Sequence, residues 1–137
     1  YIFAAYRQSP PLCHLINIKW RISAMEIEKK YLVSELPDNL PQYKCRKIEQ
    51  GYLSSSPVVR VRMDNDEYYL PLTKESYEHL IKKADGNIIT KKRYEIPDNS
   101  GHTIELDIFE GVFSGTILAE VEFDSVEEAE SYNPKKT

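Results

Sequence analysis

The sequence lacks several features that would place it quickly in a class of proteins. It has two cysteines, Cys13 and Cys45, without metal-ligand spacing, which argues against a disulfide scaffold and a zinc site and fits a reducing cytoplasm. No apolar run is long enough to cross a membrane. The net charge is −4, so bulk positive charge for nonspecific nucleic-acid binding is also missing.

The remaining composition is that of a folded domain. The chain of 137 residues suits one domain, and 41% hydrophobic residues are enough to build a core. Residues 1–24 lack the uninterrupted apolar core of a secretory signal, and Met25 is a natural start position. We therefore expect residues 1–24 to be an appended or upstream segment and residues 25–137 to be the functional domain.

Charged side chains recur with the period of a β-strand, in which residues i and i+2 share one face. Five strand-like segments carry like charges at i and i+2. The acidic pairs are Glu26 with Glu28, Glu105 with Asp107, and Glu120 with Glu122; the basic pairs are Arg60 with Arg62, and Lys91 with Arg93. Lys30 shares the face of the first acidic pair.

The separation of acidic from basic segments predicts a binding site. A single such strand more often has a solvated outer face. Independent solvated faces would mix the two signs, because opposite charges on neighbouring strands attract each other. Paired carboxylates become favourable around a divalent cation, and a lysine beside them suits a phosphate. Five segregated segments therefore favour a site that holds cations and a polyanion together.

Turn signals divide the chain into strand-like and helical segments. The expected strands are residues 25–33, 44–53, 58–63, 67–70, 87–96, 102–110 and 116–123. Thr73 caps a helix that ends near Gly86, and Ser125 with Glu128 forms the capping box of a second, short helix. We expect an α+β, mainly β fold, an antiparallel sheet that closes into a barrel because closure removes its edges. The alternation leaves open which face is inside.

Six blocks carry a family resemblance, in the family's order. They are Glu26-Ile-Glu28-Lys-Lys30, Glu49-Gln-Gly51-Tyr-Leu53, Val59-Arg60-Val-Arg62, Lys91-Lys-Arg93-Tyr94, Glu105-Leu-Asp107-Ile-Phe109-Glu-Gly111 and Ala119-Glu120-Val-Glu122-Phe123. On these residues the chain resembles the CYTH-domain proteins, the triphosphate tunnel metalloenzymes, over residues 25–134.

The resemblance implies a closed eight-stranded antiparallel tunnel with a few outer helices, which binds a linear triphosphate. It implies Mg²⁺ or Mn²⁺ in a two-metal site, which suits carboxylate ligands. The metal ligands would be Glu26, Glu28, Glu120, Glu122 and Asp107. The catalytic residues would be Glu105, Asp107 and Lys30, with the two acids at the second metal or on the attacking water. The phosphate-binding residues would be Lys30, Arg60, Arg62, Lys91 and Arg93.

Three functions are compatible with this resemblance. The first is metal-dependent hydrolysis of inorganic triphosphate, with thiamine triphosphate and RNA 5′-triphosphate as variant substrates. The second is a class IV adenylate cyclase, which would need contacts to adenine and ribose that no feature of the sequence demands. The third is a noncatalytic polyphosphate-binding module. We expect a cytoplasmic monomer or homodimer with a small-molecule triphosphate as partner, without nucleic acid or membrane.

The chain departs from the family pattern after the strand that ends at Leu70. The family continues with a Thr-x-Lys stretch and an acidic strand, whereas here Pro71 leads directly to the helix at Thr73. Either a lysine and a strand are lost, or a segment near residues 69–71 is omitted from the sequence. We favour omission, because a barrel without one strand would expose two edges.

Overall fold

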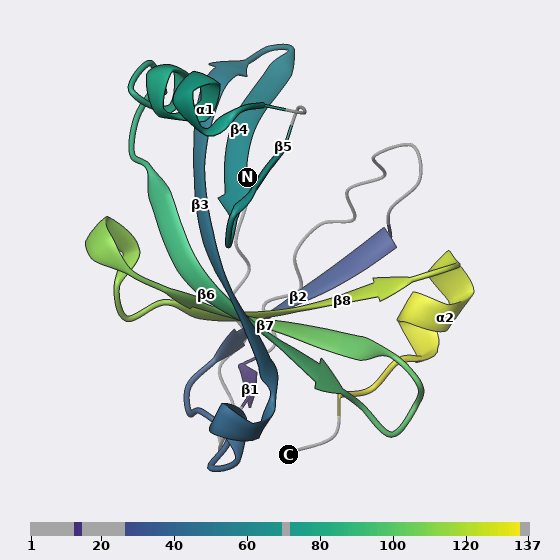
Figure 1. The fold of residues 1–137 in the computed structure, drawn as a ribbon. Helices are drawn as coiled ribbons and strands as arrows, with labels where there is room; N and C mark the ends of the chain where they lie inside the picture. Colours follow the sequence, from purple (N-terminus) through teal and green to yellow (C-terminus); the bar gives the residue numbers. More distant parts are fainter. Residues whose placement is uncertain (1–12, 15–26, 70–71, 135–137) are drawn as a thin grey trace. The chain divides into compact units, whose positions relative to one another are not determined.

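The structure, a computed structural model, describes residues 13–14, 27–69 and 72–134. These residues form mainly β-strands with two short α-helices (Figure 1). The strands are β1 (Cys13–His14), β2 (Ile27–Val33), β3 (Lys44–Ser55), β4 (Val58–Asp64), β5 (Glu67–Tyr69), β6 (Ile89–Pro97), β7 (Thr103–Phe109) and β8 (Ile117–Phe123). The helices are α1 (Lys74–Ile81) and α2 (Val126–Ser131), and short 3₁₀ turns cover Leu40–Gln42 and Gly111–Phe113. No helix in the described ranges is long and apolar enough to span a membrane.

The strands form one sheet in the order β1-β2-β8-β7-β6-β3-β4-β5. Strand β2 pairs antiparallel with β8, and β3 pairs antiparallel with β4. All seven strands expected from the sequence are present, and the two-residue β1 is an addition inside the segment 1–24. The order ends at β1 and at β5 within the described residues, so closure into the predicted barrel is not confirmed.

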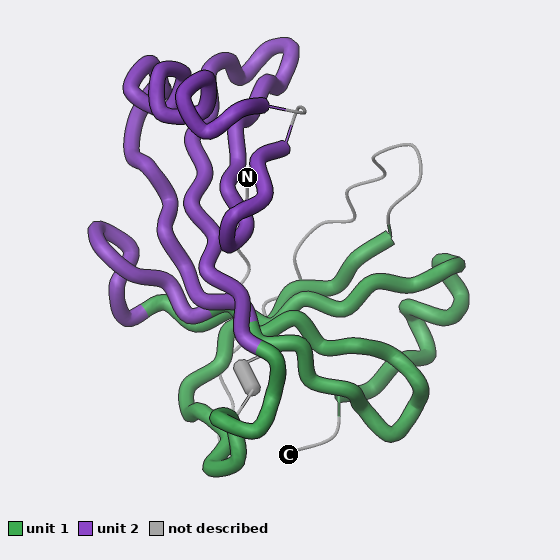
Figure 2. Tube along the Cα trace, in the orientation of Figure 1, with its two compact units in different colours: residues 1–44, 94–107, 116–137 green, residues 45–93, 108–115 purple. Residues whose placement is uncertain are grey.

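The chain divides into two units (Figure 2). Unit 1 comprises Tyr1–Lys44, Tyr94–Asp107 and Thr116–Thr137, and unit 2 comprises Cys45–Arg93 and Ile108–Gly115. Strands β6 and β7 continue from one unit into the other. The acidic strands β2 and β8 belong to unit 1, and the basic strand β4 belongs to unit 2.

The core of unit 2 lies between α1 and the strands β3 and β4. Val61, Tyr77 and Ile81 are buried there. The end of the helix and the turn after it approach β3 so closely that a Cβ atom at Gly51 would lie 2.8 Å from Ile81 Cδ1 and 2.7 Å from Ala84 Cβ. Glycine is therefore needed at this strand position to admit the helix.

Helix α2 packs on β2 and β8 in unit 1. The predicted capping box is confirmed, since Ser125 Oγ accepts a hydrogen bond from the Glu128 N–H at 3.1 Å. Glu128 Oε2 in turn accepts one from the Asp124 N–H at 3.0 Å. The rings of Phe123 and Tyr132 pack at a tilt of 60° with centroids 5.0 Å apart, which helps to hold the helix against the end of β8.

The first helix starts as predicted but ends early. Thr73 Oγ1 accepts from the Ser76 N–H at 3.2 Å, which is the expected cap. The helix ends at Ile81, however, and Gly86 at φ +77° lies in the following loop. The seam at residues 70–71 lies outside the described residues, so the omitted segment expected there remains a prediction.

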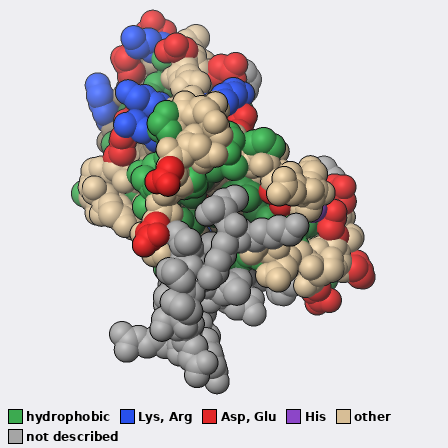
Figure 3. Space-filling view, turned by 90° about the horizontal axis from the view of Figure 1, so that it is seen from below, with side chains coloured by type: hydrophobic (Ala, Val, Ile, Leu, Met, Phe, Trp, Pro, Cys, Tyr) green, Lys and Arg blue, Asp and Glu red, His purple; other side chains and the backbone are tan. Residues whose placement is uncertain are grey.

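A few large hydrophobic side chains remain at the surface, and Figure 3 shows such side chains on one face of the molecule. Val112 and Phe113 are two of them and are adjacent in the second 3₁₀ turn. Cys45 is exposed and free among the described residues.

Candidate functional site

Four of the predicted site residues, three glutamates and one lysine, meet on two neighbouring strands of unit 1. The antiparallel register of β2 and β8 places Glu28 directly opposite Glu122, and Lys30 directly opposite Glu120. Because side chains two residues apart share a face of a strand, all four point to the same side of this ladder. The sequence predicted that the charged residues of each strand share one face. The register shows that the charged faces of the two strands lie side by side.

Lys30 lies between two of these carboxylates. Its Nζ atom is 2.6 Å from Glu120 Oε1 and 3.2 Å from Glu28 Oε1. Burial lowers the pKa of Lys30, but the hydrogen bond to Glu120 and the charges of Glu120 and Glu28 outweigh it, so the pKa is raised above its ordinary value. Lys30 is therefore a fixed cation between these two carboxylates.

The third acidic pair is on β7, the strand next to β8 in the sheet. Asp107 is 0% exposed, whereas Glu105 is half-buried. A carboxylate without exposure needs polar partners or a cation, since an isolated buried charge is strongly unfavourable. Glu26, the remaining acidic residue that the sequence predicts, lies outside the described residues.

The basic residues gather in unit 2. The register of β3 and β4 places Gln50 opposite Arg62, and Tyr52 opposite Arg60. This face of the ribbon is opposite to the one that α1 covers through Gly51 and Val61. Arg60 is exposed and Arg62 is half-buried, so one guanidinium group of this face is open to solvent and the other is partly covered.

Strand β6 adds two more cations to unit 2. Lys91 and Arg93 share one face, as predicted, and each is only 7% exposed. The Lys91 Nζ atom lies 5.4 Å from the centre of the Phe109 ring, a cation–π distance. Lys92, on the opposite face, pairs with Glu110 at 3.1 Å. The predicted pair is thus buried, while its neighbour forms a surface ion pair.

The charges of the other arginines lower the pKa of Arg62. Burial lowers its pKa most, followed by the charges of Arg93 and Arg60, and Arg46 lowers it further. Asp64 acts in the opposite direction. The Nε atom of Arg62 is buried and has no hydrogen-bond partner among the described residues. Clustered cations with a buried unused donor are the arrangement expected for an anion-binding surface.

The sequence analysis missed an ion pair in this cluster. Arg46 Nη1 lies 2.6 Å from Asp64 Oδ2, and Asp64 is 5% exposed. Arg46 lies in the expected strand 44–53 and Asp64 lies just beyond the expected strand 58–63, and neither carries one of the like-charge pairs. Only the shared even numbering of Arg46, Gln50 and Tyr52 on β3 could have indicated that Arg46 points to the same side as the predicted arginines.

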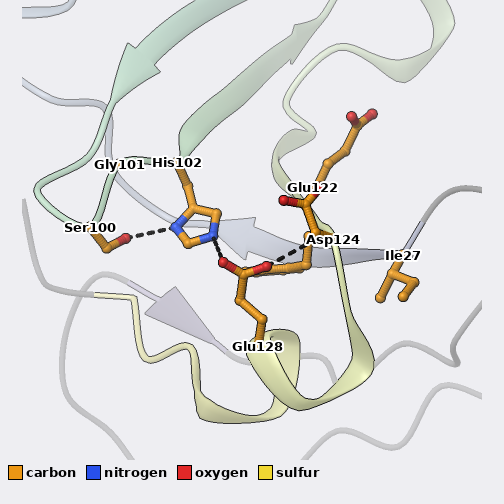
Figure 4. A pocket seen from close by; sticks show the side chains of 8 residues that line it. Ile27, Ser100, Gly101, His102, Glu122, Asp124 and Glu128 are labelled. Atoms are coloured by element: carbon orange, nitrogen blue, oxygen red, sulfur yellow. Dashed lines mark hydrogen bonds and ion pairs between the residues drawn. The ribbon is translucent and has the colours of Figure 1, made fainter.

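A polar pocket of about 280 Å³ lies elsewhere in unit 1 (Figure 4). Its imidazole, His102, is 2.8 Å from Ser100 Oγ and 3.1 Å from Glu128 Oε1. The Ser100 hydroxyl also lies 2.6 Å and 2.7 Å from the two Asp98 carboxylate oxygens. In Figure 4 the Glu122 side chain points away from this group. These contacts tie the β6–β7 turn to α2, and His102, to which the sequence assigned no role, belongs to that tie.

The acidic strands provide a donor set suited to a hard divalent cation. Glu28, Glu120 and Glu122 offer carboxylate oxygens only, which is the chemistry that Mg²⁺ and Mn²⁺ prefer. Among the described residues, which exclude Glu26, no three acidic, histidine or cysteine side chains are close enough to form a metal site. The carboxylates nevertheless already attract one cation, the Lys30 ammonium group.

Comparison with known proteins identifies the family. The chain is 33% identical over 129 residues to the inorganic triphosphatase of Nitrosomonas europaea. The matched region covers 80% of this chain and 83% of that protein. The chain belongs to the CYTH family, the triphosphate tunnel metalloenzymes. No protein-family model matches it.

Solved structures agree with the CYTH assignment. The crystal structure of the inorganic triphosphatase NE1496 superposes with a TM-score of 0.67 at 30% identity, covering 80% of this chain and 81% of that one. A second crystal structure of NE1496, there called a hypothetical protein, gives the same TM-score and covers 83% of that chain. The CYTH chain described here therefore has the mainly antiparallel β-fold of a triphosphatase.

Within this CYTH protein the predicted site residues fall into two groups. Unit 1 holds Glu28, Lys30, Glu105, Asp107, Glu120 and Glu122, and unit 2 holds Arg60, Arg62, Lys91 and Arg93. The acidic and basic sets that the sequence separates are thus also separated between the two units. Each set is assembled within its own unit.

Proposed function

We propose that the chain hydrolyses inorganic triphosphate to diphosphate and phosphate in a reaction that depends on a divalent metal. The observation that carries the proposal is the relative named an inorganic triphosphatase, 33% identical and matched over 83% of its length. The two charged groups support it, because a triphosphate needs cations for its oxygens and a metal to neutralise its charge.

The division of labour follows from the side chains. In unit 2, Arg60, Arg62, Lys91 and Arg93 would bind phosphate oxygens through charge-assisted hydrogen bonds. Guanidinium groups suit this task because their N–H groups match two oxygens at once. Burial of the β6 cations would strengthen each contact, since electrostatic attraction grows as water is excluded.

The acidic strands would hold the metal. Glu28, Glu120 and Glu122, with Glu26 and Asp107, would bind Mg²⁺ or Mn²⁺. When bound, the metal would neutralise the phosphate oxygens and lower the pKa of a water molecule. Lys30, which is held by Glu28 and Glu120, would contact the phosphate beside these carboxylates.

Glu105 and Asp107 would act on the attacking water. A carboxylate can hold the water by accepting its hydrogen bonds and can take its proton as the oxygen attacks the terminal phosphorus. The bond from that phosphorus to the bridging oxygen breaks, and diphosphate leaves. The reaction therefore needs alignment and charge neutralisation more than covalent catalysis. We further propose that the charged faces line the inside of a closed barrel.

A substrate panel tests this function. Inorganic triphosphate, ATP and thiamine triphosphate are each incubated with Mg²⁺ and with Mn²⁺, and phosphate and cyclic AMP are measured. The proposal expects phosphate release, fastest from inorganic triphosphate. Cyclic AMP from ATP would identify a class IV adenylate cyclase instead. Binding of triphosphate without release of phosphate under either metal would identify a noncatalytic polyphosphate-binding module.

A further inference from the structure

The Arg46–Asp64 pair lies on the same face of unit 2 as the predicted phosphate-binding arginines. Arg46 and Gln50 are four residues apart on β3 and therefore share a face. Gln50 lies opposite Arg62. Ile48, which lies between Arg46 and Gln50 on the same face of β3, is opposite Asp64. Arg46, Asp64 and Arg62 thus point to one side of the ribbon, away from α1.

The pair is close enough to Arg62 to influence its charge. The pKa of Arg62 is lowered by Arg46 as well as by Arg93 and Arg60, whereas Asp64 raises it. Asp64 thus offsets part of the repulsion between Arg62 and the other arginines. Within this group of arginines, Asp64 holds the guanidinium group of Arg46 at 2.6 Å.

Stability gives little reason for an ion pair at this position. Moving two charges out of water often cancels the energy that their attraction provides. The pair also brings a negative charge into a surface that otherwise collects positive charge. The small gain in stability and the negative charge on this surface are both explained if Arg46 binds an anionic ligand and Asp64 fixes the orientation of Arg46 in the absence of that ligand.

We propose that Arg46 is a further triphosphate-binding residue and that Asp64 is its positioning residue. This inference rests on the proposed function only for the identity of the ligand, and it extends the set of phosphate-binding residues beyond the four cations predicted in unit 2. Asp64 also limits affinity, because its charge repels the ligand that Arg46 attracts.

Binding without metal tests the proposal separately from hydrolysis. The Kd for inorganic triphosphate is measured by calorimetry in EDTA for the wild type and for Arg46→Ala. The matched control is Lys47→Ala, which removes the same charge from the next residue of β3, an exposed side chain on the opposite face. We expect Arg46→Ala to raise Kd at least about tenfold and Lys47→Ala to leave it nearly unchanged.

Asp64 provides the second half of the test. Asp64→Asn keeps the shape and an oxygen that can accept from Arg46, but it removes the negative charge. We expect this variant to bind triphosphate more tightly than the wild type. We also expect Arg46→Ala with Asp64→Asn to bind more tightly than Arg46→Ala alone, because the single variant leaves a buried carboxylate facing the ligand. If Arg46→Ala does not fold, Arg46→Lys replaces it in the test. Lysine keeps the positive charge but lacks the planar pair of N–H donors of a guanidinium group, so we expect a Kd above that of the wild type but less than about tenfold above it.

Each outcome separates this inference from the proposed function. Equal Kd values for Arg46→Ala and Lys47→Ala would overturn the role of Arg46, even in an active triphosphatase. A purely structural pair would lower the melting temperature of both single variants and leave Kd unchanged, which would also overturn it. A wild-type chain that binds triphosphate without cleaving it would overturn the hydrolysis, and the Kd comparison would still decide the role of Arg46.

Discussion

Glu28 lies directly opposite Glu122 on the neighbouring strands β2 and β8. Like charges at directly opposed positions destabilise a sheet. A sequence that places two carboxylates there, beside a third in Glu120, gives up stability at this point. Such an arrangement is expected where the residues serve a bound cation, because functional sites commonly depart from what local stability favours.

Replacing one of the opposed carboxylates should therefore change stability and activity in opposite directions. Glu122→Gln keeps the shape and removes the repulsion, so the metal-free chain should be more stable by a few tenths of a kcal/mol. The same variant should lose metal-dependent turnover, as should Glu28→Gln. Urea unfolding in EDTA and a phosphate-release assay measure the two effects. Glu130→Gln, which removes an exposed charge from α2, should change neither. Near wild-type activity of Glu122→Gln at limiting metal would contradict the metal assignment.

Arg60→Ala should chiefly weaken binding of triphosphate. Arg60 is exposed on the cationic face, so its removal leaves no cavity. A lost charge-assisted phosphate contact corresponds to about 1.5–3 kcal/mol. We expect KM to rise by the corresponding factor while the melting temperature stays constant. Unchanged KM and kcat would show that Arg60 does not contact the substrate.

Arg62→Met should exchange affinity for stability. The pKa of Arg62 is lowered by burial and by the charges of Arg93 and Arg60, so its charge is unfavourable without a bound anion. An apolar side chain of similar length removes that repulsion, and we expect a higher melting temperature with weaker triphosphate binding. Thermal melts with and without inorganic triphosphate measure both. A lower melting temperature without ligand would indicate a structural role for this arginine.

Gly51→Ala tests the packing of α1 on β3. The added Cβ atom would lie 2.7 Å from Ala84 Cβ in the turn after α1 and 2.8 Å from Ile81 Cδ1 in the helix, so this segment must shift. Overpacking of this kind destabilises a protein by about 1–3 kcal/mol. Ala84→Gly in the same chain removes one of the two clashes and should restore part of the stability. Chemical denaturation of the single and double variants measures the difference, and wild-type stability of Gly51→Ala would refute the close approach.

Asp98 should make the stability of the chain depend on pH in the acid range. Burial acts to raise the pKa of Asp98, but hydrogen bonds from Ser100, Tyr132 and the His102 N–H outweigh it and lower the pKa to about 2. A depressed pKa contributes stability that is fully present above the unfolded value of about 3.9 and is lost as the pH falls through about 2. Asp98→Asn should therefore be less stable than the wild type at pH 5. The difference should shrink toward pH 2 in urea unfolding, and curves that stay parallel over this range would argue against it.

The sequence was sufficient to predict most of the fold. Alternating charge located β2, β4, β6, β7 and β8, because a charged face opposite an apolar one has the period of a strand. Thr73 and Ser125 marked both helix starts, since a side-chain cap is a local signal. The end of α1 at Ile81 was not predictable in the same way, because Ala84 continues the helical spacing beyond it.

The candidate site was predictable in composition but not in pairing. Like charges at i and i+2 share a face whatever the register, so Lys91 with Arg93 followed from the sequence alone. The contact of Arg46 with Asp64 depends on a register shift in β3 between Tyr52 and Ser54. A shift of one residue exchanges the two faces of a strand, and nothing local in the sequence shows where such a shift occurs. For the same reason, closure of the barrel did not follow from the alternation.

The most direct test of the account follows inorganic triphosphate by ³¹P nuclear magnetic resonance in the presence of the purified chain and Mg²⁺. The account predicts that the triphosphate signals disappear while diphosphate and phosphate appear in equal amounts, and that EDTA stops the reaction. Triphosphate signals that broaden through binding but persist unchanged with both Mg²⁺ and Mn²⁺ would contradict it.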